Sequence, residues 1–102
     1  LHASADGPFY VIDDADVVSG AADILAMDFL NDAPLAVMAP RGDNWSVSAR
    51  SSGKPGCDME ALMQTLAAGC GGVGGGHHTR GGAKIPKENI DCFKNGFQEA
   101  CA

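Results

Sequence analysis

The sequence predicts an α/β domain with a mixed β-sheet of about four strands and three helices, in the order β-α-β-β-α-β-α. Three segments carry apolar residues at helical spacing, and short β-type runs separate them. Residues 45–50 alternate in polarity like the returning strand of a hairpin. A length of 102 residues suits one domain. We therefore expect residues 1–102 to form a single domain.

The first half of the chain contains a strand, a helix and a hairpin. Phe9–Asp13 is a short β-type run, and Ser19 can cap the helix that follows it. That helix is expected to stop at Asn31–Pro34. The unbroken apolar run Leu35–Ala39 indicates an interior strand, and the turn residues Arg41–Asn44 join it to the next strand.

The second half adds two helices and a strand. Ser51–Gly56 is expected to form a loop, and Asp58 can cap a helix whose apolar face runs from Met59 to Cys70. A strand is predicted at Gly82–Ile85, after a glycine-rich stretch. The apolar face of the third helix comprises Ile90, Phe93, Phe97 and Cys101.

Composition narrows the class of protein. An apolar fraction of 45% and a charged fraction of 20% are typical of a soluble globular domain. The apolar runs are far shorter than the roughly 20 residues of a membrane span, so no membrane partner is expected. No signal peptide opens the chain. Because the first residue is leucine, we expect a fragment or processed product of a longer protein.

Charge is distributed unevenly along the chain. The net charge of −6 disfavours a protein that coats long nucleic acids. Residues 1–32 hold seven aspartates and no lysine or arginine, whereas residues 41–84 hold five basic and three acidic residues. This pattern favours a local anion site on an acidic body. Asp13, Asp14 and Asp16 lack the glycine and glutamate of a calcium loop, so we interpret them as a solvated turn.

The four cysteines are Cys57, Cys70, Cys92 and Cys101, and no two of them have zinc-type spacing. Three lie in apolar helical segments, which favours buried, reduced thiols. We therefore expect a cytoplasmic location. Two disulfides, or less readily a metal site, remain open as alternatives.

Residues 69–82 hold eight of the fourteen glycines. Each glycine in ordered backbone lowers the stability of the fold by about 0.5–1 kcal/mol relative to alanine. So many glycines in one segment therefore suggest a specific structural or functional requirement. A flexible linker is one reading, but a strand and a helix follow directly, which favours an ordered loop. Gly71 and Gly76 have P-loop spacing, yet His77 and His78 replace the required Lys and Ser/Thr. A dinucleotide-binding fingerprint fails as well, because this stretch follows a helix instead of preceding one.

The remaining interpretation is an anion site. Successive backbone N–H groups in a glycine-rich turn can hold a phosphate, and His77 or His78 could add a directed donor. Arg50 is the second candidate, because strand alternation places it on the same side as Ser48. A guanidinium there can hold a phosphate by two parallel hydrogen bonds. Each of these side chains could instead be an ordinary solvated group.

Together, the segments Ser48-Ala-Arg-Ser51 and Gly74-Gly-Gly-His77 resemble the DHH-associated C-terminal domain. That domain is the substrate-binding half of the DHH phosphoesterases, which include RecJ-like exonucleases, oligoribonuclease-type nanoRNases, cyclic-dinucleotide phosphodiesterases and exopolyphosphatase-related proteins. The likeness extends over roughly residues 9–100. The residues that the resemblance implicates in substrate binding are Ser48, Arg50, Ser51, Ser52, Gly74, Gly75, Gly76 and His77. His78 and Arg80, which follow in the same segment, complete the candidate substrate-binding residues.

One departure from the family pattern concerns Arg80. The family usually has Ala-Ala-Gly where this chain has Arg80-Gly81-Gly82. Arg80 could therefore contact phosphate or point to solvent. The nature of the substrate also stays open, because RNA, DNA, cyclic dinucleotides and polyphosphate all present the same phosphate group.

The resemblance implies that catalysis belongs to a separate N-terminal DHH domain that binds a divalent metal, Mn²⁺ (or Mg²⁺). This chain has no Asp-His-His cluster, so we expect no catalytic residue, metal ligand or cofactor in it. The expected partners are that DHH domain and a short nucleotide or phosphodiester substrate. The alternatives are a nucleic-acid-binding module, as in alanyl-tRNA synthetases, and a structural domain that forms a homodimer. Least favoured is an independent enzyme with His77 and His78 as acid and base.

Overall fold

The computed structural model describes residues 4–29, 34–51 and 57–101. Its elements are β1 (Ser4–Asp6), β2 (Phe9–Val11), α1 (Val18–Phe29), β3 (Leu35–Arg41), β4 (Asn44–Arg50), α2 (Met59–Gly69), β5 (Val73–Gly76), β6 (Arg80–Pro86) and α3 (Ile90–Ala100). Two short 3-10 turns, η1 (Ala15–Val17) and η2 (Lys87–Asn89), precede α1 and α3. The helix end at Leu30, the stop at residues 31–33 and the loop at residues 52–56 lie outside the described residues.

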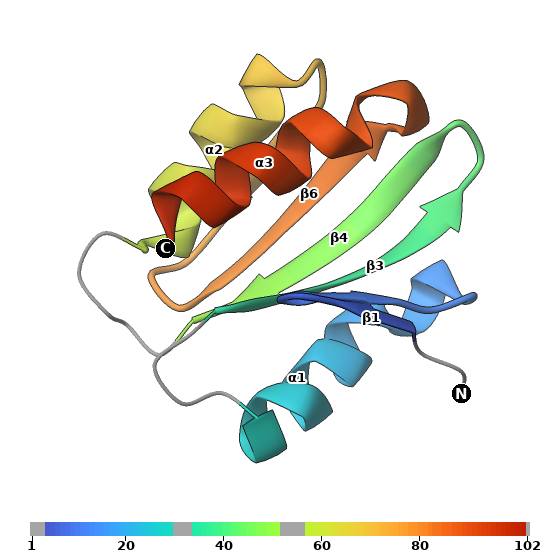
Figure 1. The fold of residues 1–102 in the computed structure, drawn as a ribbon, viewed down its shortest axis with the longest axis vertical. Coiled ribbons are helices and arrows are strands. Elements are labelled where there is room, and N and C mark those ends of the chain that lie inside the picture. Colours follow the sequence, from blue (N-terminus) through green and yellow to red (C-terminus); the bar gives the residue numbers. More distant parts are fainter. Residues whose placement is uncertain (1–3, 30–33, 52–56, 102) are drawn as a thin grey trace.

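Six strands form one sheet in the order β1-β2-β3-β4-β6-β5. Strands β2 and β3 are parallel and the other pairs are antiparallel, so the sheet is mixed. Helix α1 covers one face, while α2 and α3 cover the other (Figure 1). The predicted α/β class with three helices is therefore confirmed, and the sheet gains β1 and β5 beyond the expected strands.

The core on the α1 side is small. Val18, Ala21 and Ala22 of α1 pack against Val37 and neighbouring apolar side chains of the sheet. The prediction that Ser19 caps this helix was wrong. Asp14 caps η1 instead, since its carboxylate accepts a hydrogen bond from the backbone N–H of Asp16, and η1 leads directly into α1. Ser19 therefore lies inside the helix, where its hydroxyl accepts a hydrogen bond from Arg50 of the sheet.

The core on the other face is larger and contains the buried aromatic residues. Phe93 and Phe97 of α3 are fully buried, and the rings of Phe9 and Phe97 lie 5.5 Å apart. Helix α2 contributes the predicted apolar face, including Met63, and begins at the predicted cap, Asp58. No helix in the described part of the chain is long and apolar enough to cross a membrane.

The expectation of reduced thiols is contradicted, because the four cysteines form two disulfides. Cys57 pairs with Cys101, and Cys70 pairs with Cys92, with Cα atoms 5.2 and 6.0 Å apart. The antiparallel packing of α2 against α3 brings each pair together, since each bridge joins the start of one helix region to the end of the other. The apolar residues around the cysteines therefore surround buried disulfides in this protein, and they do not indicate free thiols.

The glycine-rich stretch is a strand hairpin for most of its length. Gly71 has a φ of 80° just after the end of α2, which a side chain would oppose. Strand β5 then pairs with β6 along the edge of the sheet. A Cβ atom on Gly74 would lie 2.6 Å from the carbonyl oxygen of Met63, and one on Gly81 would lie 2.5 Å from the Met63 Cγ atom. These two glycines allow α2 to lie directly on the sheet, which is a packing reason for their presence.

Candidate functional site

The alternation of β4 sets the orientation of the candidate residues. Val47 and Ala49 lie in the core beneath α2 and α3, so Ser48 and Arg50 face α1, as the sequence predicted. The register of β4 and β6 pairs Arg50 with Arg80 and Ser48 with Gly82. Two arginines from neighbouring strands therefore lie side by side on the α1 face of the sheet.

A pocket of about 220 Å³ opens at this point. Its lining residues are Ser19, Ser48, Arg50, Gly76, Arg80, Gly81 and Gly82. Four of these were predicted from the sequence as substrate-binding residues: Ser48, Arg50, Gly76 and Arg80. The glycines leave the floor without bulky side chains, so the polar groups of the walls converge on an accessible space.

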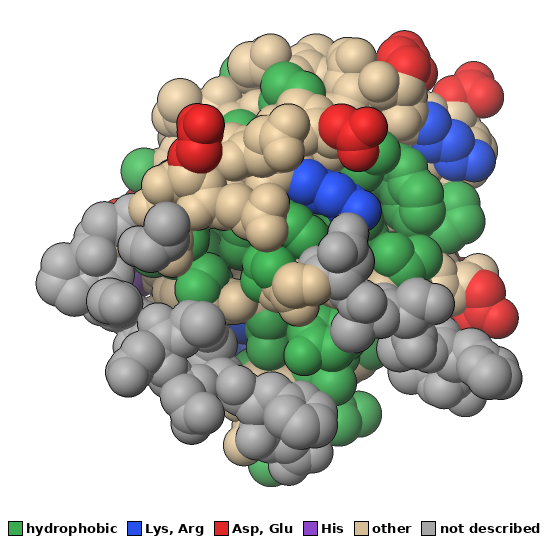
Figure 2. All heavy atoms as spheres, viewed as in Figure 1, with side chains coloured by type: hydrophobic (Ala, Val, Ile, Leu, Met, Phe, Trp, Pro, Cys, Tyr) green, Lys and Arg blue, Asp and Glu red, His purple; other side chains and the backbone are tan. Residues whose placement is uncertain are grey.

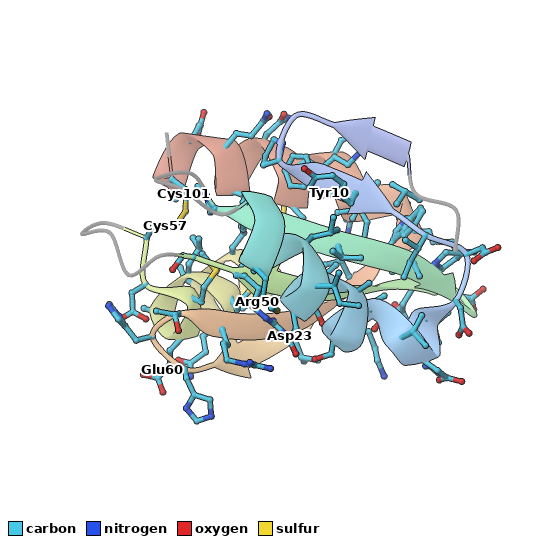
Figure 3. The ribbon with its side chains drawn as sticks, turned by 90° about the horizontal axis from the view of Figure 1, so that it is seen from below. Tyr10, Asp23, Arg50, Cys57, Glu60 and Cys101 are labelled. Atoms are coloured by element: carbon cyan, nitrogen blue, oxygen red, sulfur yellow. A yellow bond between two sulfur atoms is a disulfide. The ribbon has the colours of Figure 1, made fainter. Side chains whose placement is uncertain are left out.

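Arg50 is buried and extensively hydrogen-bonded. Its side chain is only 6% exposed. The Nε atom donates to the Asp23 carboxylate at 2.9 Å, and Nη1 donates to the carbonyl oxygen of Ala49 at 2.8 Å. Nη2 donates to both the carbonyl oxygen and the hydroxyl of Ser19. Figure 3 shows Arg50 and Asp23 facing one another between α1 and the sheet. Arg50 therefore fastens α1 to the strand.

Arg80 is about half exposed and contacts the same carboxylate. Its Nη1 atom lies 3.1 Å from Oδ1 of Asp23, and Nη2 lies 3.4 Å from Oδ2. The hydrogen bond from Arg50, together with the positive charges of both arginines, holds the pKa of Asp23 below its ordinary value. Asp23 is therefore ionised at neutral pH and bridges the two guanidinium groups.

The bridge makes the stability of the domain dependent on pH. A lowered pKa means that folding favours the ionised carboxylate, so its contribution is present above the ordinary aspartate pKa of about 3.9 and is lost as the pH falls through the folded-state value. We expect Asp23→Asn to be less stable than the wild type at pH 6, with the difference shrinking towards pH 2. Urea denaturation at each pH measures this. A difference of constant size across the range would contradict it.

Neither predicted histidine is among the residues that line the pocket. The backbone N–H of His77 donates to the carbonyl oxygen of Arg80 at 2.6 Å, so His77 closes the hairpin beside the pocket. His78 accepts from the N–H of Met59 through its carbonyl oxygen, and its Nδ1 atom lies 3.7 Å from an Asp58 carboxylate oxygen. Both side chains are exposed.

Three other predicted residues, Gly74, Gly75 and Ser51, are not among those that line the pocket. Gly74 and Gly75 are part of β5. Ser51 is buried, its N–H donates to the carbonyl oxygen of Thr79, and its hydroxyl donates to that of Cys57. Ser52 lies outside the described residues. The structure thus gathers the two arginines, Ser48 and one glycine, and gives Ser51 a role in holding the end of β4.

Sequence reasoning missed the contribution of α1. Ser19 and Asp23 are four residues apart, which places them on one face of a helix. Two polar residues at this spacing in an alanine-rich helix could have indicated a functional helix face. The sequence does not show, however, which strand that face contacts.

The charged groups elsewhere do not form a comparable site. Among the described residues there is no group of three or more His, Cys, Asp or Glu side chains that could hold a metal ion. On the face shown in Figure 2, acidic and basic side chains are spread out and do not gather in one patch. The pocket beside Arg50 is therefore the strongest candidate for an anion site.

One family model matches this chain, and several solved structures share its fold. The family model for the DHHA1 domain matches residues 7–102. The C-Ala domain of alanyl-tRNA synthetase from Aquifex aeolicus has a TM-score of 0.68 and 13% identity, and the match covers 100% of both chains. No curated protein matches the chain in sequence.

Two further solved structures have a similar fold. A DHH-domain member of the S1p family of ribosomal proteins has a TM-score of 0.63 at 23% identity and covers 99% of this chain. The pGpG-specific phosphodiesterase PggH from Vibrio cholerae has a TM-score of 0.52 at 14% identity and covers 96% of it. This chain spans 28% and 34% of those two proteins respectively, so it corresponds to one part of each.

Proposed function

Since this chain belongs to the DHHA1 domain family, we propose that it is the substrate-binding domain of a metal-dependent DHH phosphoesterase. We propose further that the pocket lined by Arg50 and Arg80 binds the phosphate of a short oligonucleotide or related phosphodiester. The observation that carries this proposal is the convergence of two arginines, two serines and unobstructed glycine backbone on one accessible space.

The two arginines have different roles in this proposal. Arg80 is about half exposed, so its guanidinium can turn towards a ligand and hold a phosphate by two parallel hydrogen bonds. Arg50 stays in the wall, where it adds positive charge in a region with little solvent. Ser48 and Ser19 border the same space and can donate hydroxyl hydrogen bonds to phosphate oxygens.

The glycine-rich hairpin would complete the site from one side. Gly76 lines the pocket, and the chain continues from it to His77, whose backbone is fixed to Arg80. His77 would thereby lie next to a phosphate held by Arg80 and could donate to it when the imidazole is protonated. Donors arranged in this way orient a phosphate and stabilise charge that develops on it.

Among the residues that the structure describes, no cluster of side chains suits a divalent metal. We therefore assign the divalent ion, Mn²⁺ (or Mg²⁺), and the hydrolysis to a separate DHH domain. This domain would bind the substrate and not cleave it. The expected cytoplasmic location rested on reduced thiols, and the two disulfides remove that basis, because persistent disulfides are typical of oxidising compartments.

Binding of a dinucleoside monophosphate tests the proposal. Amide NMR signals of residues 48–50 and 80–82 are expected to shift as the ligand is added, and Arg80→Gln is expected to weaken binding about tenfold, because it removes a charged hydrogen bond. Arg41→Gln is the matched control, since Arg41 pairs with Asp16 at the opposite end of the β3–β4 hairpin. Unmoved signals at millimolar ligand, or equal losses in both variants, would contradict it.

The likeness to the C-Ala domain over its full length supports a second candidate, a nucleic-acid-binding module outside a hydrolase. A net charge of −6 weighs against contacts along a long phosphate backbone. Titration with a structured RNA at two salt concentrations separates the candidates. A steep salt dependence would favour the module, whereas binding of the dinucleotide alone would favour the phosphoesterase.

A further inference from the structure

The carboxylate of Asp23 lies where an anion would bind. It accepts from Nε of Arg50 at 2.9 Å, and its oxygens lie 3.1 and 3.4 Å from the two terminal nitrogens of Arg80. A carboxylate held between two guanidinium groups makes the same contacts that a phosphate would make. The side chain is 44% exposed, so it borders solvent and is not locked in the core.

The donors of the two arginines are already largely used. A guanidinium has five N–H donors, and four of those on Arg50 are bonded to Asp23, Ala49 and Ser19. Arg80 directs its two terminal nitrogens, Nη1 and Nη2, at Asp23. A phosphate that binds this end of the guanidinium by two parallel hydrogen bonds must displace the carboxylate from it.

Asp23 also sets the charge of the pocket. Asp23 does not itself line the pocket, but it pairs with both arginines that do, so the two guanidinium groups and this carboxylate together carry a net charge of +1. An internal phosphodiester carries one negative charge. A terminal phosphate carries nearly two above its second pKa of about 6. A pocket of charge +1 neutralises the diester fully, but leaves one negative charge of a terminal phosphate facing the carboxylate.

We propose that Asp23 acts as an internal competitor for the anion and selects internal phosphodiester groups over terminal phosphates. This inference rests on the proposed function, because it assumes that the pocket binds phosphate. A ligand that binds Nη1 and Nη2 of Arg80 must displace the carboxylate from them, and the repulsion from Asp23 that remains grows with the charge of the ligand. The residue thereby sets the substrate class as well as the affinity.

The test compares two ligands at pH 8, a dinucleoside monophosphate with one phosphodiester and a nucleoside 5′-monophosphate with a terminal phosphate. Asp23→Asn removes the negative charge and keeps an oxygen that can accept from Arg50. It is expected to tighten binding of the diester about threefold and of the terminal phosphate about tenfold, because the Coulomb term scales with ligand charge. Isothermal titration calorimetry on the 102-residue chain measures both.

Asp16→Asn is the control. It makes the same chemical change in an aspartate that pairs with Arg41 away from the pocket, so it changes the net charge of the protein equally. We expect it to alter either affinity less than twofold. A similar gain in both aspartate variants would overturn the proposal, because it would reflect bulk charge alone.

The remaining outcomes distinguish this inference from the proposed function. Suppose that both ligands bind the wild type. If Asp23→Asn then leaves binding unchanged, weakens it, or strengthens the binding of both ligands equally, the role of Asp23 as a competitor is wrong, but the proposal that the pocket binds phosphate is retained. If neither ligand binds the wild type or the variant, the phosphate pocket itself is wrong.

A second measurement needs no variant. Carbon-13 NMR of the Asp23 carboxyl group in the wild type follows its titration with and without the dinucleoside monophosphate. Departure of Arg80 and arrival of a negative charge should both raise the pKa of Asp23. A pKa that does not rise when the diester binds would overturn the proposal.

Discussion

Replacing both Cys57 and Cys101 by alanine is expected to lower the free energy of unfolding by about 4 kcal/mol. The bridge spans a sequence separation of 44 and restricts the unfolded chain, and the entropy of closing a loop of that size gives this magnitude. The shorter bridge between Cys70 and Cys92, with a separation of 22, is expected to contribute about 3 kcal/mol. Urea denaturation of the oxidised wild type and the two double variants measures each loss.

Reductant supplies the control for this prediction. A thiol reductant should destabilise the wild type strongly and leave a variant without cysteines unchanged. If the purified wild type has four reactive thiols and its unfolding midpoint does not change when reductant is added, the disulfides are absent in solution. That outcome would restore the expectation of reduced thiols that the sequence alone suggested.

Replacing Gly74 by alanine is expected to cost about 3 kcal/mol of stability, whereas the same change at its neighbour Gly75 should stay within about 0.5 kcal/mol. A Cβ atom at position 74 would lie 2.6 Å from the carbonyl oxygen of Met63 and 2.9 Å from that of Gly82, and backbone atoms cannot move aside cheaply. A Cβ atom at position 75 meets its nearest atom, on the Gln64 side chain, at 4.0 Å.

Comparing Gly74→Ala with Gly75→Ala tests whether Gly74 is needed for packing, independently of any role in ligand binding. Both glycines belong to β5 and both were predicted as substrate contacts, so the two variants differ mainly in what lies behind each residue. Thermal unfolding followed by circular dichroism gives the two stabilities. Equal effects of the two alanines would contradict the close approach of α2 to β5 at Gly74.

The sequence predicted those elements of the fold in which apolar and polar side chains follow a regular pattern. The hairpin of β3 and β4 follows from an apolar run, a turn and an alternating strand, and its register places Ser48 and Arg50 as expected. Strand β5 was missed because Val73–Gly76 has one side chain larger than hydrogen, and glycines show no periodicity. Its pairing with β6 is fixed by the neighbouring helix, which is a tertiary effect.

The site was predictable in part for the same reason. Arg50 was predicted from the alternation of its strand, and Arg80 became a candidate as a departure from the family motif; the register of β4 and β6 places them side by side. Asp23 was missed because its role depends on where α1 crosses the sheet, which local sequence does not specify. The disulfides were missed likewise, since cysteine pairing depends on the packing of α2 against α3.

The arrangement of the two bridges has a mechanical consequence. The loop closed by Cys70 and Cys92 lies inside the one closed by Cys57 and Cys101 (Figure 3 labels the outer pair). Tension applied to the two ends of the chain would pass through the outer bridge and bypass the residues between its cysteines, shortening the reachable contour by about 160 Å. Arg50 lies on the strand that such a pull would extract, and Arg80 lies within the protected loop. The pocket beside Arg50 would therefore come apart under load while α2 and α3 remained covalently enclosed.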